Sequence, residues 1–484
     1  MPETVRTRFA PSPTGYMHIG NLRTALYEYL MAKSKGGKFI LRIEDTDQKR
    51  YVDGSVEVIY KTLKLAGLKH DEGPDIGGLY GPYVQSERKD TYLPYAKQLI
   101  EMGNAYYCFC TKDKLEQDKE SFDDGMVHRY DRCCLRLSQE EIAANLASGM
   151  PYVIRQKMPT QGSTSFDDVV YGTITIPNEE LDDQILIKSD GLPTYNFANV
   201  IDDHLMNITH VVRGSEYLTS TPKYKLLYEA YGWDVPVYVH LPLITKPGGA
   251  KMSKRAGDPS FEDLISMGYL VDAIINYVAL LGWSPGDERE FFTLSELEES
   301  FDPKGISKAP AVFDINKLSW MNGEYIRKLT HEDFHKLALP YYSDEVSEKV
   351  NTSKLSKLLQ VRTEVLSRIP ELLDFIIELP DYDIAMYTHK KKTDPQVSLS
   401  SLRAALPVLE NLTSWDADAL HSALLGLAES LGIKNGQLLW PVRCALTGID
   451  VSPGGAIEMA DLFGRDESLK RIRIGIKKLE AVVE

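Results

Sequence analysis

The stretch Arg8 to Asn21, RFAPSPTGYMHIGN, decides the fold of the first half of the chain. A short apolar run follows Arg8, two prolines and a Thr-Gly pair form a turn, and His18 opens a helical pattern. We therefore predict a strand, a tight turn and a helix N-terminus. Such N-termini carry unpaired amides and a positive dipole end, so they bind phosphate. Gly15 and Gly20 lack a Cβ, which lets a nucleotide lie close to the backbone. Taken alone, this pattern fits an ordinary strand-to-helix turn equally well.

The next thirty residues extend this pattern into a βαβ unit. Apolar residues recur at helical spacing from Leu22 to Lys35, and Gly36-Gly37 ends that helix. Residues 39–43 form a short buried strand that runs into the acidic cluster 44–47. Ligands of parallel sheets bind at the carboxyl ends of the strands, so we expect the turn and the acidic cluster at one edge. Glu44 is the better functional candidate there, because Asp47 is also placed as a helix cap.

Composition limits the class of protein. A chain of 484 residues, 43% hydrophobic and 26% charged, is expected to form about three globular domains. No apolar run is long enough to span a membrane, and the first residues lack the apolar core of an export signal. Five cysteines do not make a disulfide framework, so we expect a cytoplasmic protein. The net charge of −15 argues against non-specific coating of nucleic acid. The basic stretch 470–478 is either a local basic surface or a solvated helix face.

Changes of pattern along the chain predict several domains. We expect an α/β Rossmann-like domain, an inserted α+β module, and all-α C-terminal domains. Buried strands are predicted at 208–213 and 237–244, and helices at 271–281, 353–377, 399–412 and 417–431. The predicted boundaries are 1–84 with 186–245 for the Rossmann-like domain, 85–185 for the inserted module, 246–325 for a loop followed by a helical domain, and 326–484 for an all-helical region with two subdomains.

Two loop motifs together indicate a family. His18-Ile19-Gly20-Asn21 and Lys251-Met252-Ser253-Lys254-Arg255 both follow strands in glycine-bearing loops. They resemble the HIGH and KMSKS signatures with which class I aminoacyl-tRNA synthetases hold ATP. The segments RFAPSPTG, RIEDTD, DGLPTYNFANVIDDHLMNITHVVRG and KMSKR have the order and spacing of bacterial-type glutamyl-tRNA synthetases. The resemblance covers the whole chain, and Asn21 departs from the final histidine of the first signature.

This resemblance implies glutamate–tRNA ligation. Glutamate and ATP form glutamyl-adenylate, which passes to the terminal adenosine of tRNA(Glu) and releases AMP and diphosphate, with tRNA(Gln) as a possible further substrate. Charge builds on the phosphate, so positioning and electrostatic stabilisation carry the catalysis. The implied catalytic residues are His18, Lys251 and Lys254. The implied ATP-binding residues are His18, Gly20, Asn21, Lys251, Ser253, Lys254 and Arg255. ATP enters as a substrate, and Mg²⁺ accompanies it in the family.

The resemblance also implies a pocket that recognises glutamate at both ends. Arg213 reads the side-chain carboxylate, because a fork-shaped guanidinium matches a carboxylate bidentately. Glu44 takes the α-ammonium group. The full implied set is Arg8, Ala10, Ser12, Glu44, Tyr195, Asn199 and Arg213. For Arg213, the alternative is a structural ion pair with Glu216.

The cysteines of the inserted module suggest a metal. A CxC pair with a third cysteine about two dozen residues later is typical of thiolate zinc. Some bacterial family members carry CxC…CxH here, which assigns Cys108, Cys110 and Cys134 as ligands. Arg136 then stands where histidine is expected and arginine cannot ligate, so Cys133 or His128 is left for the fourth position. The alternative is a set of buried free thiols in a module that has lost its metal.

The resemblance implies that the Rossmann-like domain is catalytic, that the inserted module binds the acceptor end and that residues 246–325 contact the tRNA stem. It implies that the helical half, 326–484, reads the anticodon. Glutaminyl enzymes carry β-barrels in this region, so helical periodicity favours the glutamyl family. Arg362, Arg443 and the stretch 470–478 are possible tRNA contacts, each also readable as ordinary surface charge. Tyr106 and Tyr107 are candidates for stacking on the acceptor end. The family further implies a monomer and activation of glutamate that requires bound tRNA. The alternatives are a glutaminyl-tRNA synthetase and a non-catalytic tRNA-binding paralogue.

Overall fold

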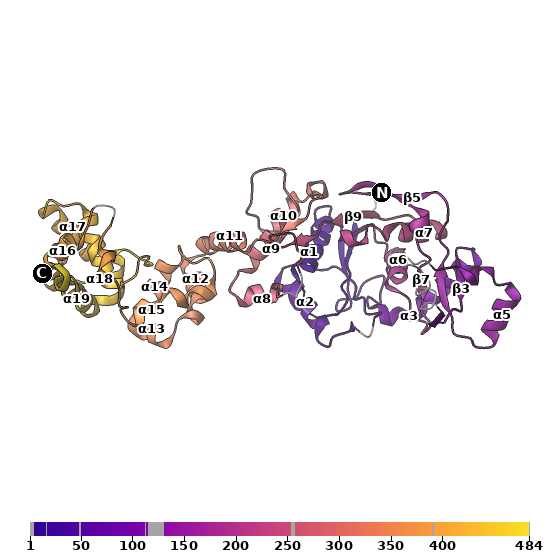
Figure 1. Cartoon of the computed structure of the whole chain (residues 1–484), viewed down its shortest axis with the longest axis horizontal. Coiled ribbons are helices and arrows are strands. Elements are labelled where there is room, and N and C mark those ends of the chain that lie inside the picture. The colour runs from indigo at the N-terminus through magenta and orange to yellow at the C-terminus, as the bar shows by residue number, and fades with distance from the viewer. Residues whose placement is uncertain are drawn as a thin grey trace. The chain divides into compact units, whose positions relative to one another are not determined.

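The chain forms two compact units (Figure 1). The computed structural model describes residues 4–15, 17–47, 50–111, 113–114, 130–252, 257–389 and 392–483. The first unit comprises Met1–Leu264 and Ile274–Asp314, and the second Ile265–Ala273 and Ile315–Glu484. Across the described ranges, every strand belongs to the first unit. None of the helices described combines the length and apolar character that a bilayer crossing requires.

The first unit alternates strands and helices, as expected for its front part. Its strands are β1 (Arg6–Phe9), β2 (Lys38–Leu41), β3 (Ala105–Cys108), β4 (Val153–Gln156), β5 (Ser163–Asp168), β6 (Gly172–Pro177), β7 (Ile185–Ile187), β8 (His210–Gly214), β9 (Val237–Leu241), β10 (Ile244–Thr245) and β11 (Ala311–Val312). Its helices are α1 (Ile19–Lys33), α2 (Ser55–Leu65), α3 (Lys89–Glu101), α5 (Gln139–Ala147), α6 (Tyr195–Leu205), α7 (Thr221–Tyr231) and α10 (Leu294–Ser300). Two further helices, α8 (Phe261–Ser266) and α9 (Val271–Ala279), each have residues in both units.

The parallel arrangement predicted for the first βαβ unit is confirmed. β1 pairs in parallel with β2, in the register Arg8 with Ile40. β8 pairs in parallel with β9, and a backbone hydrogen bond from Thr209 N to Arg6 O (3.0 Å) joins β1 to the start of β8. The carboxyl ends of β1, β2, β8 and β9 therefore lie along one edge. Ligands bind at such an edge, and Arg8 and Arg213 lie near the carboxyl ends of β1 and β8.

Residues 85–185 contain two different β structures. β3, β4 and β7 form an antiparallel sheet covered by α3, which buries Tyr92, Ala96 and Leu99. The hairpin of β5 and β6 instead joins the sheet of β8 and β9, in the order β6-β5-β9-β8. Asp168, the last residue of β5, is paired in parallel with Tyr238 of β9. The hairpin thereby brings Asp168 next to the strands that carry the site.

The second unit is helical, as expected. Its helices are α11 (Ile315–Lys328), α12 (His331–Ala338), α13 (Asp344–Lys349), α14 (Thr352–Leu359), α15 (Asp374–Ile377), α16 (Pro395–Glu410), α17 (Ala417–Ser430), α18 (Asn435–Thr447) and α19 (Ala456–Val483). One continuous apolar core of buried Leu, Ile, Phe and Ala side chains runs through them. Their residues supply the yellow and orange ribbons of Figure 1.

The helix predicted over 353–377 is wrong as a continuous element. The chain forms α14, then short 3-10 turns at Leu366–Arg368 and Pro370–Leu372, then α15. Proline at 370 lacks an amide hydrogen, and its ring clashes with the carbonyl four residues earlier, so it disfavours a continuous helix through this position. The apolar spacing persists because Leu366, in the first turn, and Phe375, in α15, are both buried in the same core. Periodicity therefore identified the buried face correctly and the element wrongly.

Candidate active site

His18 caps the helix that follows it. Its Nδ1 accepts hydrogen bonds from Gly20 N (3.1 Å) and Asn21 N (3.3 Å) at the start of α1. A ring nitrogen that accepts carries no proton, so the proton of the neutral imidazole lies on Nε2. Burial and the nearby charge of Lys251 both lower the pKa of His18, which favours this neutral form. The cap thus presents an Nε2–H donor to the site.

The same cap explains the glycine in the motif. A Cβ on residue 20 would lie 2.9 Å from His18 Cε1 and 3.0 Å from His18 Nδ1, too close for any real side chain. The helix N-terminal amides predicted to hold phosphate are therefore partly engaged by His18. The ring, and not the bare amides of residues 20 and 21, is the donor that faces the site. Asn21 itself is exposed at the mouth of the pocket.

Glu44 lies in a buried charge network at the carboxyl end of β2. Arg42 donates from Nη2 to Glu44 Oε1 (2.8 Å) and from Nη1 to Asp203 Oδ1 (2.7 Å). The second oxygen, Glu44 Oε2, is buried and has no hydrogen-bond partner within the described ranges. Burial raises the pKa of Glu44, and Arg42 opposes that shift. A buried carboxylate oxygen without a hydrogen bond is energetically unfavourable, so this atom can accept one from an ammonium group.

Arg8 belongs to the same network. Its Nε donates to Asp203 Oδ1 (2.9 Å) and its Nη1 to Glu28 Oε1 (3.1 Å). Three carboxylates, those of Glu28, Glu44 and Asp203, thus surround the guanidiniums of Arg8 and Arg42. The network lacks one positive charge when all five groups are ionised. Burial raises the pKa of Glu28 well above its ordinary value, as expected for this excess.

Arg213 shows the opposite imbalance. Its Nε donates to His240 Nε2 (3.1 Å) and its Nη2 to Thr221 Oγ1 (2.8 Å), and both partners are neutral. Among the described residues no carboxylate forms an ion pair with Arg213, so the alternative pairing with Glu216 is absent. The guanidinium lies 4.6 Å from the ring centroid of Tyr224. A buried and uncompensated cation of this kind favours an anionic ligand.

Of the other residues predicted to bind glutamate, some line the cavity and one supports a lining residue. Ala10, Ser12 and Tyr195 line the same cavity as Arg213. Asn199 is buried beneath it and donates from Nδ2 to Tyr195 O (2.7 Å), which places it as a support for Tyr195. Burial raises the pKa of Tyr195 well above its ordinary value, so its hydroxyl keeps its proton.

One cavity of about 310 Å³ collects most of these side chains. Its lining includes Arg8, Ala10, Ser12, His18, Gly20, Asn21, Tyr195, Arg213 and Lys251. Ser253, Lys254 and Arg255 lie outside the described residues. The cavity therefore has the uncompensated guanidinium of Arg213 and the side chains of His18 and Lys251 in its lining, with the carboxylate network of Glu44 close by. Such an arrangement can bind a zwitterion with an extra carboxylate beside a polyphosphate.

Comparison with known proteins identifies the family. The model for the catalytic domain of class I tRNA synthetases (E and Q) matches residues 4–320, and that for an anticodon binding domain matches residues 333–476. The glutamate–tRNA ligase of Clostridium novyi is 60% identical over 99% of this chain and 99% of its own length. The chain belongs to the glutamate–tRNA ligase family. It is thus a class I aminoacyl-tRNA synthetase that uses ATP to join glutamate to tRNA(Glu).

Further relatives of this ligase agree over its full length. The glutamate–tRNA ligase of Clostridium acetobutylicum is 60% identical over 98% of this chain and 99% of its own. A crystal structure of a glutamate tRNA ligase from Elizabethkingia meningosepticum, in complex with its amino acid, superposes with a TM-score of 0.87. That protein is 37% identical and covers 99% of this chain and 100% of its own. The Rossmann-like and all-helical classes predicted for the two halves are confirmed.

The thiols of the inserted module have a geometry that suits zinc. The Sγ atoms of Cys108, Cys110 and Cys134 lie within 4.8 Å of one another, and Cys110 Sγ is 3.6 Å from Cys134 Sγ. Two sulfurs bound to one zinc at about 2.3 Å in a tetrahedron are about 3.8 Å apart. Cys133 Sγ lies 3.2 Å from Cys110 Sγ, and Tyr130 Oη lies 3.1 Å from Cys108 Sγ. His128 is outside the described residues.

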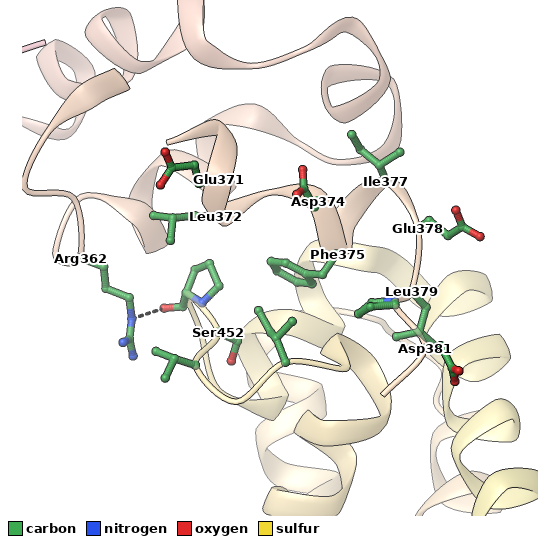
Figure 2. A pocket seen from close by; sticks show the side chains of 14 residues that line it. Arg362, Glu371, Leu372, Asp374, Phe375, Ile377, Glu378, Leu379, Asp381 and Ser452 are labelled. Carbon is green, nitrogen blue, oxygen red and sulfur yellow. Dashed lines mark hydrogen bonds between the residues drawn. The ribbon is translucent and has the colours of Figure 1, made fainter. Parts of the chain in front are cut away.

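Arg362 is one of the residues that line a cavity in the helical unit (Figure 2). It has a volume of about 1040 Å³, and Arg362 is the one cation among the described residues that line it. Arg362 Nε donates to Pro453 O (3.0 Å), as Figure 2 shows. Apolar side chains such as Phe375 and Leu379 line it together with four carboxylates, those of Glu371, Asp374, Glu378 and Asp381.

Two of the basic tRNA candidates are structural. Arg443 is buried and donates to Ile449 O (3.1 Å) and Ser452 Oγ (3.2 Å). Within the stretch 470–478, Arg471 is 1% exposed and donates to the carbonyls of Phe375 and Leu446. Their positive charges hold loop and helix carbonyls inside the core. The prediction of tRNA contacts at Arg443 and Arg471 is therefore wrong.

The prediction that Tyr106 stacks on the acceptor end is also wrong. Its side chain is buried and donates to Asp183 Oδ2 (2.7 Å), so it cannot stack on a nucleotide. Tyr107 is half-buried and packs edge-on against Tyr152, with centroids 5.0 Å apart. The alternation of a strand places these neighbours on opposite faces, which explains why only one of them keeps an open side.

Sequence reasoning missed several residues of the site. Asp203, Glu28 and the pair Asp168–His240 complete the charge network and the Arg213 contacts. Asp203 had a usable signal, because two adjacent acidic residues in an otherwise apolar helical stretch are unusual on a buried face. Glu28, Asp168 and His240 carried no such signal in the sequence, because each acts through a partner far away in the chain.

We expect the charge network to make glutamate binding depend on pH. Only the carboxylate form of Glu44 accepts from an ammonium group, and burial raises the pKa of that carboxyl. We expect the KM for glutamate to rise as the pH falls from 8 to about 5.5, where free glutamate still carries both of its carboxylates and its ammonium. Glu44→Gln, which keeps an acceptor for Arg42, should raise the KM about 10- to 100-fold and remove this acid limb. Pyrophosphate exchange at several pH values checks this, and an acid limb that persists in the variant would contradict it.

Proposed function

We propose that the cavity beside β1 and β8 binds glutamate and ATP together in the residue roles that follow. The observation that carries this is a contrast among the described residues: Arg213 has only neutral hydrogen-bond partners, while the buried Glu44 Oε2 has no hydrogen-bond donor. Glutamate supplies a carboxylate for the first and an ammonium for the second. Glutamine would leave the Arg213 charge without a counter-ion, which costs several kcal/mol when buried.

The ATP end of the site is supported by His18 and Lys251. The Nε2–H of His18 donates to a phosphate oxygen, and the ammonium of Lys251 attracts the leaving diphosphate. The α-carboxylate of glutamate attacks the α-phosphorus of ATP, the bond to the β-phosphate oxygen breaks, and diphosphate leaves. No protein base is required, because the attacking carboxylate is already ionised. Mg²⁺ bound to ATP would supply additional charge neutralisation. Ser253, Lys254 and Arg255 keep their predicted roles in the same loop as Lys251.

The transfer step uses the adenylate as acyl donor. A ribose hydroxyl of the terminal adenosine attacks the activated carbonyl and AMP leaves. The cavity lined by Tyr152, Lys188 and Tyr195, of about 780 Å³, is the proposed entry for the acceptor end. Tyr107 packs against Tyr152 at this face. The cavity around Arg362 is the proposed pocket for an anticodon nucleotide, because single-stranded bases are read by stacking and by arginine donors. We further propose a cytoplasmic monomer.

Exchange of labelled diphosphate into ATP tests this function. With glutamate and purified tRNA(Glu) we expect exchange, and with glutamine we expect none. Omitting tRNA should abolish the exchange if glutamate activation requires bound tRNA, and full exchange without tRNA would refute that requirement. Aminoacylation of purified tRNA(Glu) and tRNA(Gln) in parallel tests the predicted further substrate. Absence of glutamyl-tRNA(Glu) would overturn the proposal.

Zinc in the inserted module is a separate prediction. We propose that Cys108, Cys110 and Cys134 hold Zn²⁺, with Cys133 or His128 completing four ligands. Metal analysis of the purified protein should find about one zinc per chain. Cys108→Ser should lose it, whereas Cys444→Ser, in a buried thiol of the other unit, should retain it. A metal-free wild-type protein purified without chelator would show that these are free thiols.

A further inference from the structure

A buried aspartate and histidine lie behind Arg213. Asp168 ends β5 and His240 lies in β9, and both side chains are fully enclosed. Asp168 Oδ2 accepts from His240 Nδ1 (2.7 Å) and from His240 N (3.0 Å). Its Oδ1 accepts from Val170 N (2.9 Å) and Tyr171 N (2.8 Å). Because an ionised carboxylate has no proton to donate, the proton of the ring must lie on Nδ1.

The other ring nitrogen consequently offers a lone pair to Arg213. Nε2 of His240 accepts from Arg213 Nε at 3.1 Å. Thr221 Oγ1 is 3.2 Å from the same nitrogen, but the threonine hydroxyl donates to Tyr217 O (2.8 Å) and accepts from Arg213 Nη2 (2.8 Å). The hydroxyl hydrogen is therefore already used. Two neutral acceptors, one from β9 and one from α7, thus hold two edges of the guanidinium.

The neutrality of these acceptors matters for the charge of the site. The groups around His240 are Asp168 from β5, Arg213 from β8, Thr221 from α7 and the rings of Phe166 and Tyr238, with the field of Glu216 beyond. Burial lowers the pKa of His240, and Arg213 adds to that shift, so the ring stays uncharged. A carboxylate in direct contact would orient Arg213 equally well but would neutralise it. An interposed imidazole orients it and leaves the charge for the ligand.

We propose that Asp168 and His240 are positioning residues that fix the tautomer and orientation needed to keep Arg213 uncompensated, and thereby maintain the affinity for glutamate. This inference rests on the proposed role of Arg213 in binding the substrate side chain. It assigns no chemical step to either residue. The hydrogen-bond acceptor at the Nε2 position of residue 240 maintains the affinity for glutamate; filling the buried space is not sufficient.

Two substitutions of His240 separate orientation from packing. Rotated into the place of the ring, the glutamine amide puts its oxygen near the Nε2 position, so His240→Gln keeps an acceptor for Arg213. The shorter asparagine amide reaches only the Nδ1 position, so His240→Asn keeps the donor to Asp168 and loses the acceptor. We expect His240→Asn to raise the KM for glutamate about tenfold or more. His240→Gln should stay within about threefold of wild type, with kcat and the KM for ATP little changed in both variants.

A third substitution tests the tautomer. Asp168→Asn places an amide N–H against Nδ1, which drives the ring proton to Nε2, where it meets the donor of Arg213. We expect the KM for glutamate to rise about tenfold or more, as when a wrong tautomer is imposed on a catalytic histidine. The ring nitrogens can be observed by ¹⁵N NMR of histidine-labelled protein, with the His240 signals assigned by their loss in His240→Gln. Wild type should show a protonated Nδ1 and an unprotonated Nε2.

The outcomes distinguish this inference from the function on which it rests. Equal effects of His240→Asn and His240→Gln on the KM for glutamate, or no effect of either, would overturn the positioning role. A protonated Nε2 in the wild-type spectrum would do the same. If Arg213→Met itself leaves the KM for glutamate unchanged, then the proposed role of Arg213 fails, and the positioning role falls with it. Failure of the His240 variants alone leaves the role of Arg213 intact.

Discussion

Replacing Arg213 by methionine is expected to lower kcat/KM for glutamate by roughly 150- to 5000-fold. This corresponds to about 3–5 kcal/mol, the cost of removing one partner from a buried charged pair. The guanidinium has only the neutral acceptors His240 and Thr221 as protein partners among the described residues, so the substrate carboxylate would be its counter-ion. Methionine fills a similar volume and lies between the same tyrosine rings. The loss in kcat/KM should therefore measure the missing charge and hydrogen bonds, and not the effect of an empty cavity.

A matched variant separates charge from geometry. Arg213→Lys keeps the positive charge but offers a point donor instead of a fork, so we expect an intermediate loss in kcat/KM. Exchange assays with glutamate and glutamine in the presence of tRNA give both specificity constants, and the KM for ATP serves as the control. The discrimination between the two amino acids should fall in the order wild type, lysine, methionine. Wild-type discrimination in Arg213→Met would refute the assignment.

Replacing His18 should reduce adenylate formation by about 10²- to 10³-fold. That is the usual effect of removing one preorganised donor from a developing negative charge. The Nδ1 contacts with Gly20 and Asn21 fix the ring and leave Nε2–H as the donor. His18→Ala removes the donor and the helix cap together. His18→Asn keeps an acceptor for the helix amides, since asparagine is among the best N-caps, but is too short to reach the phosphate.

These two variants distinguish catalysis from folding. Both should lower kcat for exchange to the same extent, with little change in the KM for glutamate. Only His18→Ala should lose the cap, worth about 1 kcal/mol, which corresponds to a fall of about 1–2 °C in the unfolding midpoint. Scanning calorimetry with the exchange assay measures both effects. Normal exchange rates in His18→Asn would show that the histidine serves as a cap and not as a donor.

Local patterns were sufficient for the parallel front of the first unit. The Arg8–Asn21 stretch predicted β1, the turn and α1, because apolar runs, turn residues and caps act over a few positions. The same reasoning failed over 353–377, where turns and a helix share one buried face. It also failed at Arg471, a basic residue in a charged stretch that proves to be 1% exposed. Helical spacing reports which face is buried, but it does not report whether the backbone is continuous.

The sequence by itself determined the class of enzyme and the residue types at its site, since motifs and strand ends are local properties. The tertiary structure alone decided which charges are compensated. Arg8 and Arg213 both end buried strands and look alike in the sequence. Arg8 meets Asp203 and Glu28, whereas Arg213 meets His240, whose proton is set by Asp168. These partners lie 20 to 195 positions away along the chain. Electrostatic interactions depend on distance in space, so only the fold could show which arginine keeps its charge for the substrate.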